Sequence, residues 1–447
     1  MMHSLSLQQL AACVGGEIKG QTSQQIISVY IDARQVHSGA LFVALPGQRV
    51  DGHHFLEQAR KNQASAALVE RFQDSELPQI KVASTKAALA SLASYNRKLF
   101  TAPLVAVTGN SGKTSVKEML AALLTAYRSQ VLATRGNLNN ELGVPLTLLG
   151  LQPVNTAAVV ELGANHLQEI DFLAALAQPD IGIITNVTGA HLGEFGSRQA
   201  IAQAKAELLA HINTKGCAIL NADDEFYDFW RQQVTTQVLT FGFNHADICA
   251  TKVHLDKLGN SEFQVITPWG EQMFYLPLPG KHNVANALAA IAAAGHLGVP
   301  LALQAEVLKK LQPVPGRLHR VNAWGGALLL DDSYNASPDA VKVAIDLLAA
   351  MPGKKILALG SLAELGTATA AIHTELGCYA RQQGLHALFV LEGAASLAAK
   401  AFGEGAYVAV SHQPLAEAIK PHLDANTRLL VKGSRSSAMD KLVVLLS

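Results

Sequence analysis

A glycine-rich turn between an apolar run and a helix-like segment carries the strongest chemical signal in the sequence. It reads TGNSGKT and comprises Thr108, Gly109, Asn110, Ser111, Gly112, Lys113 and Thr114. Glycines let successive backbone N–H groups turn toward a phosphate, and the N-terminus of the following helix attracts the same anion. Lys113 can reach the terminal phosphates, and the Thr114 hydroxyl can bind Mg²⁺. We therefore predict a nucleotide site, although Val107 stands where the strict pattern has another glycine; a structural turn is the alternative.

Two further side chains follow strand-like runs and suit a metal ion. Glu161 comes directly after the apolar run 158–160, and His191 lies in a loop of small residues after the run that ends near residue 185. Carboxyl ends of parallel strands meet at one edge of a sheet, so both side chains are expected near the phosphate-binding turn. The alternatives are a helix-capping acid for Glu161 and a solvated loop histidine for His191. We predict metal binding at both.

The last third of the chain holds two polar segments that also follow apolar runs. They are DDSYNA, with Asp332, Tyr334 and Asn335, and KGSR, with Lys432, Ser434 and Arg435. An apolar strand that ends in a polar turn is a typical place for ligand contacts, and KGSR offers cations and a hydroxyl to an anion. Turn chemistry explains the first segment as well, and an ordinary basic loop explains the second.

Alternating strand-like and helix-like segments must position these residues, and they predict an α/β fold. Strands are expected at 104–107, 157–160, 181–185, 327–330, 355–359, 387–391 and 428–431, and helices at 115–127 and 286–295. The PVPG segment at 313–316 is the best linker signal. We predict three domains with the bounds 1–84, 85–314 and 315–447, the last a small doubly wound sheet.

Bulk composition narrows the class of protein. The chain has 447 residues, of which 49% are hydrophobic and 16% charged, as expected for two to four well-packed domains. Formal net charge is zero, so no overall field favours nucleic acid or an anionic membrane. The four cysteines have no metal-like spacing and suggest reduced thiols. Without a signal-like start or a run long enough to span a membrane, we expect a cytoplasmic protein and, given its neutral charge, a monomer.

The ordered set of motifs resembles the Mur ligases over nearly the whole chain. It consists of TGNSGKT, ELGANH, the His191 loop, GKHNVANALAA, PGRLHR, DDSYNASPD and VKGSR. DSYNA, together with GNLNN at 136–140 and GALFVAL at 39–45, is similar to the member that adds D-alanyl-D-alanine. Other Mur ligases and folylpolyglutamate synthase carry different residues at DSYNA.

The resemblance implies three domains: an N-terminal α/β domain that binds UDP, a central P-loop ATPase-like domain with a parallel sheet, and a C-terminal Rossmann-like domain. It implies ATP-dependent ligation of D-alanyl-D-alanine to UDP-N-acetylmuramoyl-tripeptide through an acyl phosphate, in peptidoglycan synthesis. ATP and two Mg²⁺ ions are the expected cofactors. The third residue of the acceptor peptide, diaminopimelate or lysine, is left open.

The resemblance also assigns roles to residues whose local sequence is uninformative. Lys205 looks like a helix-surface lysine, but it matches the position that Mur ligases carbamylate for a second Mg²⁺. Catalytic and metal roles thus fall to Lys113, Thr114, Glu161, His191 and Lys205. Besides the turn, the ATP contacts are Asn283 and Asn286 near the adenine and Arg317 and Asp332 near phosphate and ribose. The expected substrate contacts are Asp32, Arg34, Arg49, Asn137, Asn139, Asn140, Tyr334, Asn335, Lys432, Ser434 and Arg435.

Two departures from the family pattern leave alternatives open. Ala33 stands where the family has Ser or Thr between Asp32 and Arg34, and Ser361 replaces the acid of a Gly-Asp-Met-Ala-Glu-Leu-Gly motif. The rivals are an amide ligase for another acid or amine, a nucleotide-dependent switch that makes no bond, and a ligase fold inactivated by drift. DSYNA disfavours the first, and the combination of Glu161, His191 and Lys205 disfavours the second.

Overall fold

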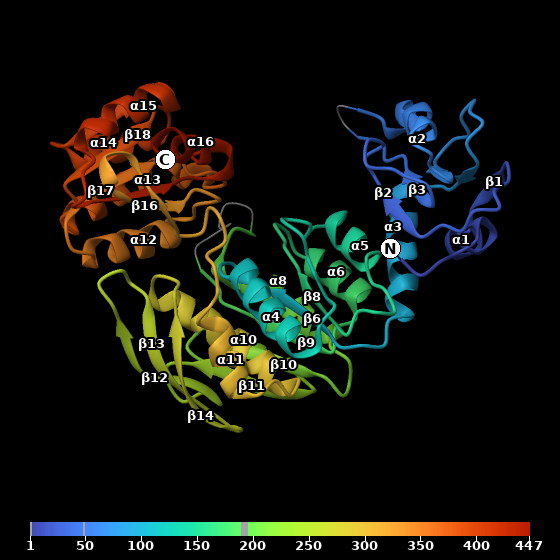
Figure 1. The fold of residues 1–447 in the computed structure, drawn as a ribbon, viewed down its shortest axis with the longest axis horizontal. Coiled ribbons are helices and arrows are strands. Elements are labelled where there is room, and N and C mark those ends of the chain that lie inside the picture. Colours follow the sequence, from blue (N-terminus) through green and yellow to red (C-terminus); the bar gives the residue numbers. More distant parts are fainter. Residues whose placement is uncertain (1, 48–49, 189–194) are drawn as a thin grey trace.

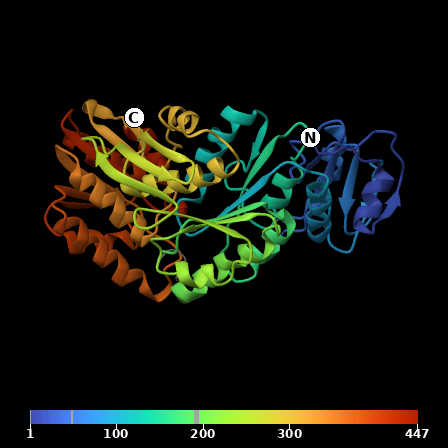
Figure 2. The ribbon, with the colours of Figure 1, turned by 90° about the horizontal axis from the view of Figure 1, so that it is seen from below.

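The computed structural model describes residues 2–47, 50–188 and 195–447, which form three α/β units in chain order (Figure 1). Each unit is built on its own sheet, of five, nine and six strands. The N-terminal and C-terminal units lie at opposite ends of the molecule, with the central unit between them (Figure 2). Among the described residues, no helix combines the length and the apolar character needed to cross a bilayer.

The N-terminal unit is a small, mostly parallel sheet in the order β1-β5-β4-β3-β2, with only β1 antiparallel to its neighbour. Its elements are α1 (Leu7–Val14), β1 (Glu17–Lys19), β2 (Ser28–Tyr30), β3 (Ala40–Val43), η1 (Gly52–Phe55), α2 (Leu56–Lys61), β4 (Ala66–Val69) and β5 (Gln79–Lys81). Helix α3 (Thr85–Lys98) follows and packs in one apolar cluster with residues of both the N-terminal and the central unit.

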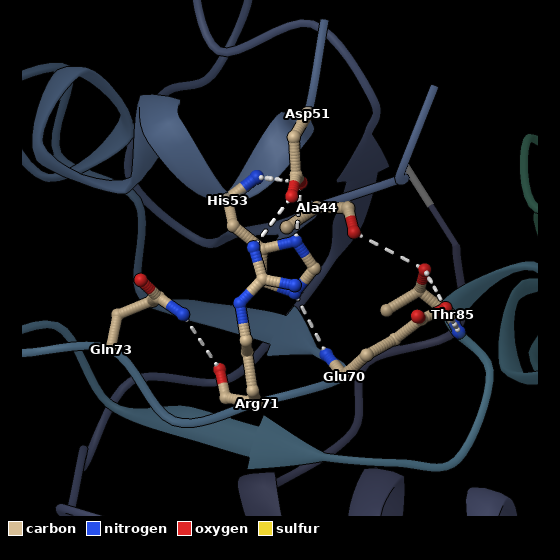
Figure 3. A network of polar contacts seen from close by, with 7 residues as sticks. All are labelled: Ala44, Asp51, His53, Glu70, Arg71, Gln73 and Thr85. Atoms are coloured by element: carbon tan, nitrogen blue, oxygen red, sulfur yellow. Dashed lines mark hydrogen bonds and ion pairs between the residues drawn. The ribbon is translucent and has the colours of Figure 1, made fainter. Parts of the chain in front are cut away.

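A polar network ties η1 and the end of β4 to the start of α3 (Figure 3). The buried His53 ring donates from Nδ1 to Asp51 Oδ1 (2.6 Å), and its Nε2 accepts the Glu70 N–H (2.9 Å). Asp51 also accepts from Arg71 (2.6 Å), and Glu70 Oε1 accepts the Thr85 N–H (2.9 Å). Hydrogen bonds from His53, first of all from its backbone, and then from Arg71 hold the pKa of Asp51 well below its usual range. The network therefore orients the helix that leads into the central unit.

Replacing His53 by alanine is expected to lower the free energy of unfolding of the N-terminal unit by about 2–4 kcal/mol. The change leaves a cavity and removes the acceptor of the buried Glu70 N–H. Calorimetry of the variant checks this. His54→Ala is the matched control, because the neighbouring ring is exposed; equal losses from the two variants would contradict the role of the network.

The central sheet has the order β14-β13-β12-β11-β10-β9-β6-β8-β7. Its strands are β6 (Leu104–Thr108), β7 (Val131–Ala133), β8 (Ala157–Glu161), β9 (Ile181–Ile184), β10 (Cys217–Asn221), β11 (Gln237–Gly242), β12 (Ile248–Leu255), β13 (Ser261–Thr267) and β14 (Gly270–Leu276). Its helices are α4 (Lys113–Arg128), α5 (Gly143–Leu148), α6 (Glu169–Ala177), α8 (Arg198–Ala206), η2 (Glu207–His211), α9 (Tyr227–Arg231), α10 (Lys281–His296) and α11 (Leu301–Leu308). β6 lies between β9 and β8, with α4 and α10 on one face and α3, α5 and α6 on the other.

The predicted parallel sheet is confirmed from β7 to β12, since each neighbouring pair there is parallel. The predicted strands do not include β13 and β14, which extend the sheet antiparallel. Their alternating burial differs from the continuous apolar runs of the inner strands, because only one of their faces is covered. The predicted helix at 115–127 lies within α4, where Met119, Leu120, Leu123 and Leu124 recur at helical spacing and are buried, while Tyr127 near its end is exposed.

The C-terminal unit is the predicted doubly wound sheet. Its strand order is β15-β16-β20-β17-β18-β19, and neighbouring strands are parallel except for β15 and β16. Its elements are β15 (His319–Asn322), η3 (Trp324–Gly326), β16 (Leu328–Asp332), α12 (Pro338–Ala350), β17 (Lys354–Leu359), η4 (Gly366–Ala368), α13 (Thr369–Gln382), β18 (Ala387–Leu391), α14 (Ala395–Phe402), β19 (Ala406–Ala409), α15 (His412–Ile419), η5 (Lys420–His422), β20 (Thr427–Lys432), η6 (Arg435–Ser437) and α16 (Asp440–Leu446). Helices α12 to α14 cover one face, and α15 and α16 cover the other.

Candidate active site

A cavity of about 1030 Å³ lies between the central and C-terminal units, at the carboxyl ends of β6, β8, β16 and β20. Such edges are where open α/β sheets bind ligands. The cavity is lined by these predicted site residues: Asn110, Ser111, Gly112, Lys113, Thr114, Asn137, Asn139, Asn140, Glu161, Asn283, Asn286, Arg317, Asp332, Tyr334, Asn335, Lys432, Ser434 and Arg435. The fold thus gathers residues that are more than 300 positions apart in the sequence.

The glycine-rich turn follows β6 and opens α4, as the sequence predicts. Gly112 has a φ of +83°, and a Cβ there would lie 2.2 Å from Asn286 Oδ1, so only glycine fits. The end of β9 holds the turn: Asn186 Oδ1 accepts the Ser111 N–H (3.0 Å), and the Thr185 hydroxyl donates to the Ser111 carbonyl (2.7 Å). The turn is therefore shaped before any phosphate binds.

Lys113 lies over this turn. Its Nζ donates to the carbonyls of Gly109 (2.7 Å) and Asn110 (2.9 Å). Burial lowers the pKa of Lys113, and the neighbouring Glu161 carboxylate opposes that shift. An anion bound at the turn would replace the two carbonyls as the partner of the Lys113 ammonium. Its negative charge would offset the cost of burying that ammonium.

Glu161 presents one free carboxylate oxygen. Oε1 accepts from Asn139 Nδ2 (2.8 Å), whereas no donor among the described residues reaches the buried Oε2. A buried carboxylate oxygen without a partner fits a cation ligand. The Thr114 hydroxyl accepts from Arg317 (3.0 Å), so it too faces the space where phosphates would bind.

The described residues contain no cluster of three His, Cys, Asp or Glu side chains that would form a complete cation cage. Magnesium in nucleotide sites needs none, because one or two protein oxygens join substrate phosphates and waters around the ion. Thr114 and Glu161 therefore fit a nucleotide-bound Mg²⁺. His191 and Arg49, both predicted site residues, lie outside the described residues.

Lys205 is not the helix-surface lysine that its local sequence suggests. Only 2% of the residue is exposed, and its Nζ lies 3.5 Å from the Ala164 carbonyl oxygen and 5.4 Å from the centroid of the Phe195 ring. Burial, reinforced by the charge of Lys113, lowers the pKa of Lys205 to about 7. The local pattern failed because the partners that bury Lys205 come from other parts of the chain.

A smaller cavity of about 100 Å³ lies behind the turn, lined in part by His282 and Asn286 of α10. Asn283 Oδ1 accepts from Asn286 Nδ2 (3.2 Å), which fixes both amides. His282 lies in the GKHNVANALAA motif but is not among the predicted site residues. Its Nδ1 is buried with no partner among the described residues, and burial lowers its pKa to about 4, so the ring is neutral at pH 7. His282 is therefore a further candidate for ligand contact.

An ion pair, a hydrogen bond and a cation–π contact order the C-terminal side of the cavity. Lys432 Nζ donates to Asp332 Oδ2 (2.5 Å) and to the Asn335 carbonyl (3.0 Å). The Arg317 guanidinium lies 4.5 Å from the centroid of the Tyr334 ring. These contacts join DDSYNA to KGSR at neighbouring strand ends, and through Arg317 they reach the phosphate-binding turn.

Several predicted residues have structural partners of their own. Ser434 donates to the Ser361 carbonyl (2.6 Å), and Asn140 Oδ1 accepts the Gly143 N–H at the start of α5 (2.9 Å). Arg435 reaches Asp440 (3.2 Å). Asp32 and Arg34 pair with each other (2.8 Å) in the N-terminal unit and do not line the large cavity. Their substrate roles remain predictions.

The structure accommodates both departures from the family pattern. Ala33 is buried in an apolar cluster of the N-terminal unit, where its methyl group packs. The Ser361 hydroxyl accepts the Ala395 N–H at the start of α14 (3.2 Å). Neither Ala33 nor Ser361 lines the large cavity.

Comparison with known proteins agrees with this geometry. Three family models match: "Mur ligase family, catalytic domain" at 25–97, "Mur ligase middle domain" at 107–294, and "Mur ligase, glutamate ligase domain" at 316–435. UDP-N-acetylmuramoyl-tripeptide–D-alanyl-D-alanine ligase of Escherichia coli (strain K12) is 40% identical, over 99% of this chain and 98% of the relative.

Solved structures of MurF are similar over most of their length. MurF from Acinetobacter baumannii has a TM-score of 0.93 and 35% identity, covering 99% of this chain and 98% of that one. MurF ligase from Thermotoga maritima in complex with ADP has a TM-score of 0.84 and 29% identity, covering 94% of this chain and 96% of that one. Because the three family models together match most of the chain, and a relative is 40% identical over nearly its full length, the chain belongs to the Mur ligase family.

Proposed function

We propose that this Mur ligase joins D-alanyl-D-alanine to UDP-N-acetylmuramoyl-tripeptide, with release of ADP and phosphate. The observation that carries the proposal is the single cavity in which the glycine-rich turn and Glu161 face Arg317 and Lys432. A phosphate donor and an incoming amine can meet there. The relative that is 40% identical bears the name of this activity, and a similar solved structure holds ADP.

The first step activates a carboxylate, which is a poor electrophile. A carboxylate oxygen of the tripeptide attacks the γ-phosphorus of ATP, and the bond between that phosphorus and the β–γ bridging oxygen breaks, leaving its electron pair on ADP. In this proposal, the N–H groups of the turn, Lys113 and Arg317 hold the phosphates and offset the charge that accumulates between the two anions. The products are ADP and an acyl phosphate.

Mg²⁺ would be held by Thr114 and Glu161, and a second ion by His191 and a carbamylated Lys205. When bound, these ions neutralise phosphate charge and orient the transferred group. A carbamate forms when a neutral amine captures CO₂, and the lowered pKa of Lys205 keeps a large share of the amine neutral near pH 7. The modification would turn a buried cation into an anionic oxygen ligand.

The second step forms the amide bond. The neutral amine of D-alanyl-D-alanine attacks the acyl carbon, and the tetrahedral intermediate collapses with loss of phosphate and one proton. Lys432, Ser434 and Arg435, on the C-terminal side of the cavity, would hold the dipeptide carboxylate or the leaving phosphate. Acyl phosphates hydrolyse in water. Placing the central and C-terminal units around one cavity would therefore also limit the access of water to the acyl phosphate.

The remaining assignments extend this proposal to the whole chain. Asp32, Arg34 and Arg49 would bind the UDP end of the acceptor in domain 1–84, while 85–314 binds ATP and 315–447 the dipeptide. Asn137, Asn139 and Asn140 line the same cavity as Glu161 and would face the tripeptide. We further propose that the enzyme acts as a monomer in the cytoplasm, where ATP and UDP-linked substrates are made.

Phosphate release from Mg-ATP, with mass detection of the peptide product, tests the proposal. We expect release only when UDP-N-acetylmuramoyl-tripeptide and D-alanyl-D-alanine are both present, with one pentapeptide formed per phosphate. Acceptors with diaminopimelate and with lysine at the third position should be compared. Turnover with glutamate, lysine or diaminopimelate in place of the dipeptide would identify a different amide ligase. ATP hydrolysis without any peptide product would contradict a ligase altogether.

A further inference from the structure

Two buried residues outside the cavity connect the elements that carry Thr114 and Glu161. We propose that Lys117 and Thr134 are positioning residues that set the spacing between these two cation ligands. The inference rests on the proposed function, since it takes the cation of that site as given. Neither residue lines the large cavity, so neither has a direct part in the chemistry.

The two ligands belong to different elements, and among the described residues their side chains hydrogen-bond to Arg317 and Asn139 rather than to each other. Thr114 lies in the first turn of α4, and Glu161 is the last residue of β8. A ligand pair for Mg²⁺ works only if its oxygens keep near-ideal distances, because this small ion demands a strict geometry. Something must therefore hold the helix against the end of the strand.

Thr134 supplies the contact to the strand. It follows β7, where its N–H donates to the Val159 carbonyl (3.0 Å) and continues the pairing with β8. The Thr134 hydroxyl oxygen then accepts the Glu161 N–H (3.0 Å). A side-chain oxygen thus takes the place of a strand carbonyl at the point where the chain leaves the sheet, and it anchors the backbone of Glu161. Asn139 holds the side chain of Glu161 from the other side.

Lys117 supplies the contact to the helix. It lies one turn after Thr114 on α4, and only 1% of the residue is exposed. Its Nζ donates to the Thr134 carbonyl (2.8 Å) and to Glu118 Oε1 (2.5 Å). Burying an ammonium is costly unless it is hydrogen-bonded and paired, so packing alone does not explain a lysine here. The chain of contacts therefore runs from Thr114 along α4 to Lys117, through Thr134, to Glu161.

The test compares the affinity of the full-length protein for ADP in Mg²⁺ and in EDTA, by calorimetry. The dissociation constant in EDTA divided by the dissociation constant in Mg²⁺ measures the contribution of the cation to binding, independently of turnover. Thr134→Val keeps the shape of the side chain but removes the acceptor, and Thr134→Ser keeps the acceptor. We expect Thr134→Val to reduce the ratio about ten-fold, with the EDTA value unchanged, and Thr134→Ser to stay near the wild-type ratio. Lys117→Met should lower the ratio in the same direction.

Three results would overturn the inference. An unchanged ratio in Thr134→Val would show that the hydroxyl does not position the cation. An equal loss of affinity in Mg²⁺ and EDTA would show that the residue supports the nucleotide turn or the fold instead. A wild-type protein that binds ADP equally well in both buffers would overturn the proposed cation site, and the inference with it. If Lys117→Met fails to fold, the two Thr134 variants decide alone.

Discussion

Replacing Lys113 by methionine is expected to lower kcat for ligation by about a hundred- to a thousand-fold. The ammonium lies over the phosphate-binding turn, 2.7 Å and 2.9 Å from two of its carbonyl oxygens. In a site shielded from water, one preorganised donor to a developing negative charge has an effect of that size. Phosphate release and pentapeptide formation, measured at saturating ATP, check the prediction.

The same variant separates a catalytic role from a structural one. Burial lowers the pKa of Lys113, which means that the folded protein disfavours the charged form. Methionine fills similar space without a charge, so we expect an unchanged or higher melting temperature. Lys310→Met is the control, since Lys310 is an exposed lysine outside the cavity. Activity of Lys113→Met within a few-fold of the wild type would remove Lys113 from the proposed mechanism.

Replacing Lys205 by arginine is expected to lower activity by about a hundred-fold, although arginine keeps the charge and nearly the length of a protonated lysine. Arginine stays protonated in proteins and cannot capture CO₂, so the proposed carbamate cannot form. A loss of about a hundred-fold is at the upper end of the range expected when a group that supports a metal site is removed. The wild-type protein should incorporate ¹³CO₂ and show a carbamate carbon by NMR, and the variant should not.

The incorporation of ¹³CO₂ at Lys205 is expected to decrease as the pH is lowered. With a pKa of about 7 for Lys205, the neutral amine is the reactive form, and its fraction falls as pH falls. Labelling should therefore drop about ten-fold between pH 8 and pH 6. Lys215→Arg serves as the control, because Lys215 is exposed and lies outside the cavity. Full activity of Lys205→Arg, or a wild-type protein without the label, would exclude the carbamate.

Much of the fold follows from local sequence. Continuous apolar runs such as 157–160 and 429–431 became buried strands, because a strand covered on both faces needs apolar residues at every position. The turn of TGNSGKT and its helix formed as expected, since only glycine fits at Gly112. Local patterns did not reveal β13 and β14, whose alternating residues depend on which face the rest of the sheet leaves uncovered.

Other features depend on contacts between distant segments. Lys205 has the sequence context of a surface lysine, yet α8 packs it inside the central unit, beside Ala164. The free oxygen of Glu161 exists because Asn139, from another loop, binds only one of its two oxygens. No spacing rule predicts such contacts, because each partner is placed by the fold.

By itself, the sequence determined the α/β class, the phosphate-binding turn and the order of the motifs that identify the family. These depend on residue types at short range, where backbone geometry and hydrophobic periodicity act. Only the tertiary structure decided that Arg317 reaches Thr114 and that Lys117 reaches Thr134. Such pairs form when separate elements pack together, and the cost of burying their charges makes the exact partner matter. The chemistry of the site therefore depends on distances between residues that are far apart in the sequence, and the sequence alone does not give these distances.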